Sequence, residues 1–187
     1  MPHAPVPWTR YVALLRGINV GGRNLIRMAD LAACFAAEGL ADVATYIQSG
    51  NVLFTSREAD RTALTRRIEE MLAAAFDYEA SVVLRNRRQM QGVIRRAPEG
   101  FGTDPATYRY DVIFLKDPLT AAKAVRGVPA RDGVDEVRAG TGVLYFSRLI
   151  SRATQSQLSR LVSMPIYRHM TIRNWNTTTK LVELLGG

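Results

Sequence analysis

The spacing of apolar residues predicts alternating strands and helices in the first half of the chain. Tyr11–Arg16 is a short apolar run that ends before a glycine, which is typical of a buried strand. Met28, Leu31 and Phe35 then recur at helical spacing. The pattern continues with strands at 43–48, 52–55 and 81–85, and with a helix that starts after Asp60 and carries Leu64, Ile68, Met71, Leu72 and Phe76.

The same order of elements recurs in the second half. Asp117 and Pro118 are predicted to be the N-cap and first residue of a helix that ends at Gly127, because proline is favoured at that position. Asn176 or Thr177 is predicted to cap a C-terminal helix. The remaining elements are a linking helix after Asn86, strands at 110–115, 134–138, 143–147 and 170–173, a helix around Leu158 to Val162, and the C-terminal helix at 177–185.

Two successive strand-helix-strand-strand-helix-strand patterns predict an α+β protein made of two ferredoxin-like (βαββαβ) subdomains in tandem. A linking helix and a C-terminal helix complete this fold class. We expect a loose N-terminal arm at residues 1–9, a first subdomain at 10–86, a linking helix and loop at 87–108, and a second subdomain at 109–187.

This topology brings two polar loops of the first subdomain together. A right-handed helical crossover makes the first two strands parallel, with the third strand antiparallel between them. The carboxyl ends of the first two strands therefore lie at one edge of the sheet. We expect the glycine-rich loop after Arg16 to meet the turn that begins at Gln48.

Composition and charge limit the classes of function. The chain has 25 Lys and Arg residues against 17 Asp and Glu, a formal charge of +8, which favours a phosphorylated small molecule or nucleic acid as a partner. A single cysteine excludes a disulfide framework and a cysteine-rich metal site, so we expect no metal and no cofactor. No apolar run is long enough to span a membrane and the N-terminus lacks a hydrophobic signal region, so we expect a cytoplasmic protein without a membrane partner. The oligomeric state stays open.

The loop at 17–24 has some features of a phosphate-binding P-loop. Arg23 can approximate the lysine of that motif, but Asn24 cannot supply the hydroxyl that binds Mg²⁺. Two alternatives stay open. The glycines serve backbone geometry alone, or their N–H groups form a non-catalytic anion cradle together with Arg16 and Arg23.

The polar segment from Asn174 to Lys180 opens an apolar helix. Free amides and threonine hydroxyls at a helix N-terminus attract anions, and Lys180 lies one turn further along. The alternative is that Trp175 anchors the core and the threonines only cap the helix.

Other candidate residues for catalysis or binding are weaker: Cys34 sits among apolar residues, and no nucleophile elbow accompanies His169. The third strand, 52–55, lacks the start of an RNA-binding RNP1 sequence, so no base-stacking platform is evident.

Three blocks of the sequence resemble the bacterial domain of unknown function 1697 family. They are Leu14 to Gly22 with Asn24 and Met28, then Thr45 to Val52, and Arg173 to Lys180. The chain departs from the family pattern at Arg23, where lysine is frequent, and at Ala32, where arginine is frequent. The resemblance implies two α/β subdomains of ferredoxin-like character, and it implies no activity. It also implies that the recurrent polar residues of the family fall in the segments described above.

The leading hypothesis is a cytoplasmic protein with an anion-binding cleft for a phosphate, a nucleotide or a nucleic-acid backbone. An enzyme acting on a phosphorylated or nucleotide substrate, with unknown catalytic residues, is one alternative. A protein-interaction scaffold is another. The expected ligand-binding residues are Arg16, Gly17, Asn19, Gly21, Gly22, Arg23, Asn24, Gln48, Ser49, Asn51, Asn174, Asn176, Thr177 and Lys180.

Overall fold

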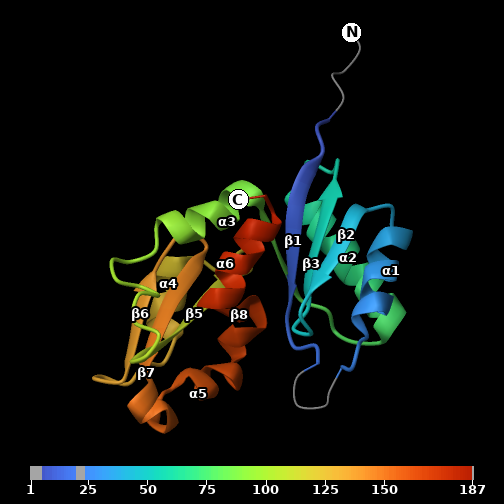
Figure 1. The fold of residues 1–187 in the computed structure, drawn as a ribbon. Coiled ribbons are helices and arrows are strands. Elements are labelled where there is room, and N and C mark those ends of the chain that lie inside the picture. The colour runs from blue at the N-terminus through green and yellow to red at the C-terminus, as the bar shows by residue number, and fades with distance from the viewer. Residues whose placement is uncertain (1–5, 20–23, 187) are drawn as a thin grey trace. The chain divides into compact units, whose positions relative to one another are not determined.

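A computed structural model describes residues 6–19 and 24–186 (Figure 1). It is a mixed α+β structure with two four-stranded antiparallel sheets and helices. The chain divides into two compact units, which are described one at a time. The first unit holds the described residues up to Arg87 and those from Glu183 onward, and the second holds Arg88–Val182. No helix in the described part of the chain is both long and apolar enough to cross a membrane.

The first unit has the predicted order of elements. Its strands form the order β2-β3-β1-β4, and β3 is antiparallel to both β1 and β2, so β1 and β2 are parallel as expected. The second strand ends earlier than predicted, because Ile47 has a left-handed backbone with φ +51°. The elements are β1 (Thr9–Leu15), α1 (Met28–Ala37), β2 (Ala41–Tyr46), β3 (Asn51–Ser56), α2 (Arg61–Phe76) and β4 (Val82–Asn86).

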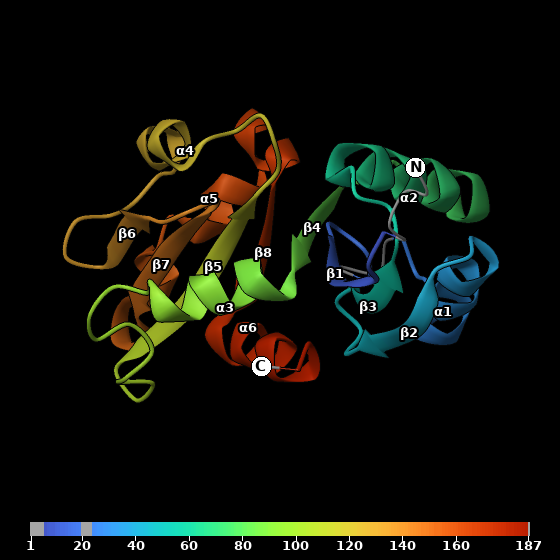
Figure 2. The same ribbon diagram turned by 90° about the horizontal axis from the view of Figure 1, so that it is seen from above.

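The core of the first unit lies between its sheet and helices α1 and α2, which cover the same face (Figure 2). Leu31 and Phe35 of α1 and Leu64, Ile68 and Leu72 of α2 are buried, as their spacing predicted. The side chain of Asp60 caps α2 by accepting hydrogen bonds from the N–H groups of Thr62 (2.8 Å) and Ala63 (3.1 Å). Apolar spacing and one capping residue are therefore enough to place this helix.

The second unit repeats the order of strands and helices. Its sheet has the strand order β6-β7-β5-β8, with β5 antiparallel to β7 and β8. Two short 3₁₀ segments, Ile150–Gln155 and Pro165–His169, flank the second of its covering helices. The elements are α3 (Arg87–Arg95), β5 (Tyr108–Leu115), α4 (Ala121–Gly127), β6 (Asp135–Ala139), β7 (Val143–Leu149), α5 (Leu158–Val162), β8 (Met170–Asn174) and α6 (Trp175–Leu184).

The two faces of the second sheet are covered differently. Helices α4 and α5 pack over one face and enclose Ile113, Leu144 and Phe146. Side chains alternate between faces along a strand, so Tyr145 points to the other face. There α3 lies across the sheet (Figure 2), and the Tyr145 hydroxyl donates a 2.6 Å hydrogen bond to the Val93 carbonyl. This second face carries the aromatic residues that matter below.

Two predicted helix starts are wrong. Pro118 does not begin α4, and it occupies a turn closed by a hydrogen bond from the Leu119 N–H to the Lys116 carbonyl (3.0 Å). The cap of α4 is Thr120, whose Oγ1 accepts from the Lys123 N–H (3.3 Å). Likewise α6 begins at Trp175, before both predicted caps, because Asn174 supplies the capping oxygen.

Candidate functional site

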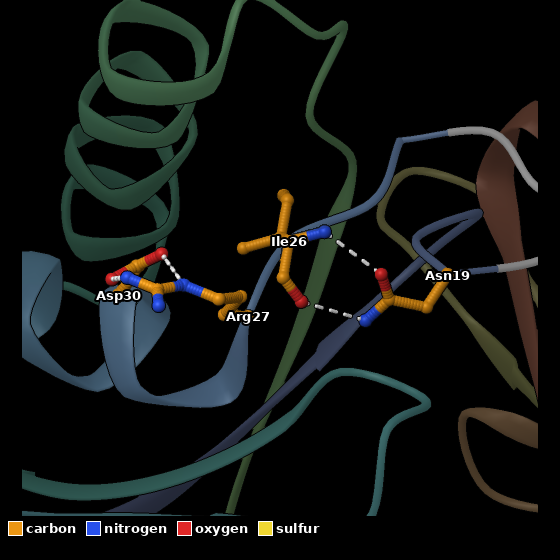
Figure 3. Close-up of polar contacts among 4 residues, drawn as sticks. All are labelled: Asn19, Ile26, Arg27 and Asp30. Carbon is orange, nitrogen blue, oxygen red and sulfur yellow. Dashed lines mark hydrogen bonds and ion pairs between the residues drawn. The ribbon is translucent and has the colours of Figure 1, made fainter.

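The two polar loops of the first unit meet at the edge of its sheet, as the topology predicted. The Leu15 N–H donates to the Gly50 carbonyl (2.9 Å), which joins β1 to the turn after β2. The Asn19 amide nitrogen donates to the carbonyls of Gln48 and Ile26, at 2.9 Å each. Its Oδ1 accepts from the Ile26 N–H at 2.8 Å (Figure 3). Asn19 therefore joins both limbs of its own loop to the neighbouring turn.

Other asparagines of this region also hold the backbone. Asn24 Nδ2 donates to the Gly17 carbonyl (2.9 Å), and Asn51 Nδ2 donates to the Tyr46 carbonyl (3.0 Å) and to Ser49 Oγ (3.1 Å). These contacts agree with the alternative in which the loop residues serve backbone geometry. Gly21, Gly22 and Arg23 lie outside the described residues, so the anion cradle they were expected to form stays a prediction.

Two of the described arginines around this loop, Arg16 and Arg27, have neighbours within the first unit. Arg27 donates two hydrogen bonds to the Asp30 carboxylate, at 2.7 and 2.8 Å (Figure 3), and these bonds lower the pKa of Asp30. Arg16 is half-buried near the Tyr78 phenol. Burial raises the pKa of Tyr78 to about 12, the Arg16 charge opposes that rise, and Glu69 adds to it. The role of Arg16 in ligand binding stays a prediction.

Ile47, in the turn beside Asn19, has a strained backbone. Its φ of +51° lies in the left-handed region, which is unfavourable for a β-branched residue, and its side chain is 47% exposed. Replacing Ile47 by glycine should therefore raise the free energy of unfolding by about 1 kcal/mol, measured by urea denaturation. The control is Gln48→Gly at the neighbouring position, which has no positive φ. There glycine should lower the free energy of unfolding, because it relieves no strain and adds freedom to the unfolded chain. If the Ile47→Gly protein were less stable than the wild type, the backbone of Ile47 would not be strained.

A recess in the second unit brings together charged, aromatic and amide side chains. It has a volume of about 370 Å³ and lies where β8 ends and α6 begins. We name it the α6 recess. Its principal lining side chains are aromatic (Tyr108, Tyr110 and Trp175), charged (Arg109, Asp111 and Arg148) and amide (Asn174 and Asn176).

The register of the sheet assembles this recess. Arg109 of β5 pairs with Arg148 of β7, and Asp111 pairs with Asn174 of β8. Asn174 then caps α6, because its Oδ1 accepts from the Thr177 N–H at 2.7 Å. The predicted residues Asn174 and Asn176 thus line the recess. Buried Thr177 and exposed Lys180 are not part of its lining.

The polar groups of the recess are only partly satisfied within the protein. Asp111 Oδ2 lies 3.5 Å from Arg148 Nη2, and the Asp111 side chain is 11% exposed. In the described part of the chain, Asp111 Oδ2 and Arg148 Nε are buried atoms without a hydrogen-bond partner. Burial raises the pKa of Asp111, and the Arg148 and Arg109 charges oppose that rise. With two arginines and one aspartate, the recess offers both cationic donors and a carboxylate acceptor.

Sequence reasoning missed most of these residues. It tested for base-stacking residues only at 52–55, in the first unit, whereas the aromatic side chains that line the recess lie in the second. Phe101 lies edge-on to the rings of Tyr110, Tyr145 and Trp175, with centroids 4.9, 5.2 and 5.1 Å away. The available signal was the alternation Tyr108-Arg109-Tyr110 at the start of a strand, which interleaves aromatic and basic side chains.

Nucleophiles and metal ligands do not gather at this recess. Cys34 lies on α1 of the first unit, where burial raises the pKa of its thiol. His169 Nε2 accepts a hydrogen bond from Arg168 Nε (3.0 Å) and does not line the recess. Over residues 6–19 and 24–186, no three His, Cys, Asp or Glu side chains are grouped so that they could hold a metal ion.

Comparison with known proteins agrees with this two-sheet architecture. The solved structure of the conserved bacterial protein SP0830 from Streptococcus pneumoniae is similar to this chain, with a TM-score of 0.82 and 28% sequence identity. The similarity covers 96% of this chain and 99% of that protein. None of the curated proteins matches the chain significantly. The family model described as "Protein of unknown function (DUF1697)" matches residues 8–145, and the chain therefore belongs to this family.

Proposed function

We propose that the protein binds a nucleotide in the α6 recess, with the base against the aromatic side chains and the phosphate against the arginines. One observation carries this proposal: Tyr108, Tyr110 and Trp175 line the same cavity of about 370 Å³ as Arg109 and Arg148. Among the anions that the sequence favoured, a nucleotide uses both kinds of side chain. A simple phosphate would leave the aromatic wall without a role.

The chemistry of each part supports this assignment. An aromatic ring that stacks on a base contributes about 1–3 kcal/mol and accepts any base, because every base has a π-face. A guanidinium group matches the geometry of phosphate oxygens through paired N–H donors. The recess also adjoins the first turn of α6, a helix of 10 residues, where the helix dipole favours negative charge.

We infer that each unit is a ferredoxin-like subdomain and that the protein acts in the cytoplasm. The order of elements in each half and the strand orders β2-β3-β1-β4 and β6-β7-β5-β8 support the first inference. The second follows from the proposed ligand, since nucleotides are cytoplasmic metabolites. The anion site predicted from the sequence in the first unit, around Arg16 and Gln48, is a separate proposal, and the asparagine contacts there agree with its alternative, a role in backbone geometry.

Calorimetric titration with AMP tests the proposed function. We expect saturable binding to the wild type, weakened by about tenfold or more in Arg109→Ala, because a charge-assisted hydrogen bond contributes about 1.5–3 kcal/mol. Arg109 is exposed, so its truncation leaves the core intact. Arg126→Ala is the matched control, since Arg126 is also exposed in the second unit but lies on α4 outside the recess. Equal affinities for the two variants, or no AMP binding at all, would contradict the proposal.

A further inference from the structure

We propose that the ligand of this protein is a single-stranded nucleic acid, whose second base enters an adjacent cavity that is also lined by Tyr108 and Tyr110. This inference rests on the proposed function and specifies its class of ligand. The adjacent cavity has a volume of about 210 Å³ and is named here the sheet cavity. Its lining includes Phe101, Tyr108, Tyr110, Glu136, Arg138 and Tyr145.

The sheet cavity and the α6 recess share two walls. Tyr108 and Tyr110 line both spaces, and their rings are tilted by 41° with centroids 6.1 Å apart. Both side chains are half-buried, so part of each ring is accessible. Two successive bases of one strand can therefore contact the same pair of tyrosines, one base in each cavity. A mononucleotide would occupy only one of the two cavities.

The shape of both cavities is fixed by packing. Phe101 lies edge-on to Tyr145 in the sheet cavity and to Trp175 in the α6 recess, so it joins the walls of the two. The Tyr145 hydroxyl is held by the Val93 carbonyl, which sets the orientation of that ring. A preformed aromatic wall lowers the entropic cost of ordering a flexible strand.

Charge at the rim of the sheet cavity suits a nucleotide. Glu136 and Arg138 are exposed neighbours on β6, and Arg138 Nε donates to Glu136 Oε1 at 2.6 Å. A carboxylate accepts hydrogen bonds from the amino groups of bases, and a guanidinium donates to phosphate oxygens. Arg138 lines the sheet cavity and Arg109 and Arg148 line the α6 recess, so each cavity has an arginine for one of the repeated phosphates of a nucleic-acid strand.

The strands involved are those on which RNA-recognition sheets place their stacking residues. Tyr108 and Tyr110 lie on the first strand of the second unit, and Tyr145 lies on its third. Because Phe101 contacts both Tyr110 and Tyr145, it occupies the middle of this face. The nucleic acid would therefore lie at the Tyr108 end of β5, where Tyr108 and Tyr110 line both cavities.

Titration of AMP and of the 5′-phosphorylated dinucleotide pApA into the full-length protein tests this inference. We expect pApA to bind about tenfold more tightly than AMP, because the second nucleotide adds a base on the tyrosines and a phosphate on Arg138. Arg138→Ala should abolish most of this gain and leave AMP binding unchanged. Arg131→Ala, an exposed arginine of the same unit outside both cavities, should leave both affinities unchanged.

The outcomes separate the two proposals. Normal AMP binding with pApA no tighter than AMP would overturn the single-strand inference and leave the proposed function standing. A loss of AMP and pApA affinity by equal factors in Arg138→Ala would also overturn it, since the sheet cavity would then not be specific to the second nucleotide. Absence of AMP binding to the wild type would overturn the proposed function and this inference with it.

Discussion

Replacing Gly102 by alanine should lower the free energy of unfolding by about 3 kcal/mol and weaken nucleotide binding. Gly102 has φ +86°, a conformation that costs a residue with a side chain about 1–2 kcal/mol. A Cβ at this position would also lie 2.2 Å from Nε1 of Trp175, a collision that adds about 1–3 kcal/mol. The indole packs against Phe101, so the ring cannot move without disturbing the wall of the α6 recess.

Gly100→Ala provides a matched control for this collision. Gly100 lies in the same loop with φ +76°, but the nearest atom to its Cβ would be Thr103 Oγ1 at 3.9 Å. Gly100→Ala should therefore lower the free energy of unfolding by only about 1–2 kcal/mol, the cost of the positive φ, and leave AMP affinity unchanged. Urea denaturation and calorimetry on both variants measure the difference. Equal losses of stability for Gly100→Ala and Gly102→Ala would show that Trp175 does not need the space above Gly102.

Replacing Asn19 by alanine should lower the stability of the first unit by about 3 kcal/mol. The Asn19 side chain makes three hydrogen bonds, two to Ile26 and one to Gln48, and each contributes about 1 kcal/mol. Its φ of +53° also suits asparagine better than alanine. Urea denaturation measures the overall loss. Amide exchange of Ile26, whose N–H donates to Asn19, gives a local reading and should become faster.

Asn24→Ala is the comparison for Asn19→Ala. Asn24 also has a positive φ, +48°, but its side chain makes one hydrogen bond to the backbone, to Gly17. The loss of stability should therefore be smaller by about 2 kcal/mol, the difference of two hydrogen bonds. If the two variants lost the same stability, the bonds from Asn19 to Ile26 and Gln48 would not be what holds the loop against the turn.

The fold was largely predictable because its determinants are local. Leu64, Ile68 and Leu72 recur at helical spacing and are all buried on α2, and Asp60 caps that helix. The handedness of the crossover then made β1 and β2 parallel, which brought Asn19 to the Gln48 turn. The predicted first residues of two helices were wrong because other residues supply the capping oxygen. Thr120 caps α4, and Asn174 caps α6.

The candidate site was predictable only in part. Asn174 and Asn176 were found because a helix start has a sequence signature, and they line the α6 recess. Arg148 could not be found in this way, because its place beside Asp111 depends on how β5 and β7 pair. Trp175 was noticed as a possible core anchor, yet it lines the recess. A cavity lined by residues that are distant in the sequence can be predicted only when the register of the sheet is known.

The central claim, that a nucleotide binds in the α6 recess, is tested most directly by an NMR titration of ¹⁵N-labelled protein with AMP. The chain contains two tryptophans, Trp8 and Trp175, and their indole N–H groups give separate signals. Trp175 lines the recess, whereas Trp8 lies in the first unit under the Arg57 guanidinium. We predict that AMP shifts the Trp175 indole signal saturably and leaves the Trp8 signal in place. A Trp175 signal that does not move at saturating AMP would contradict the account.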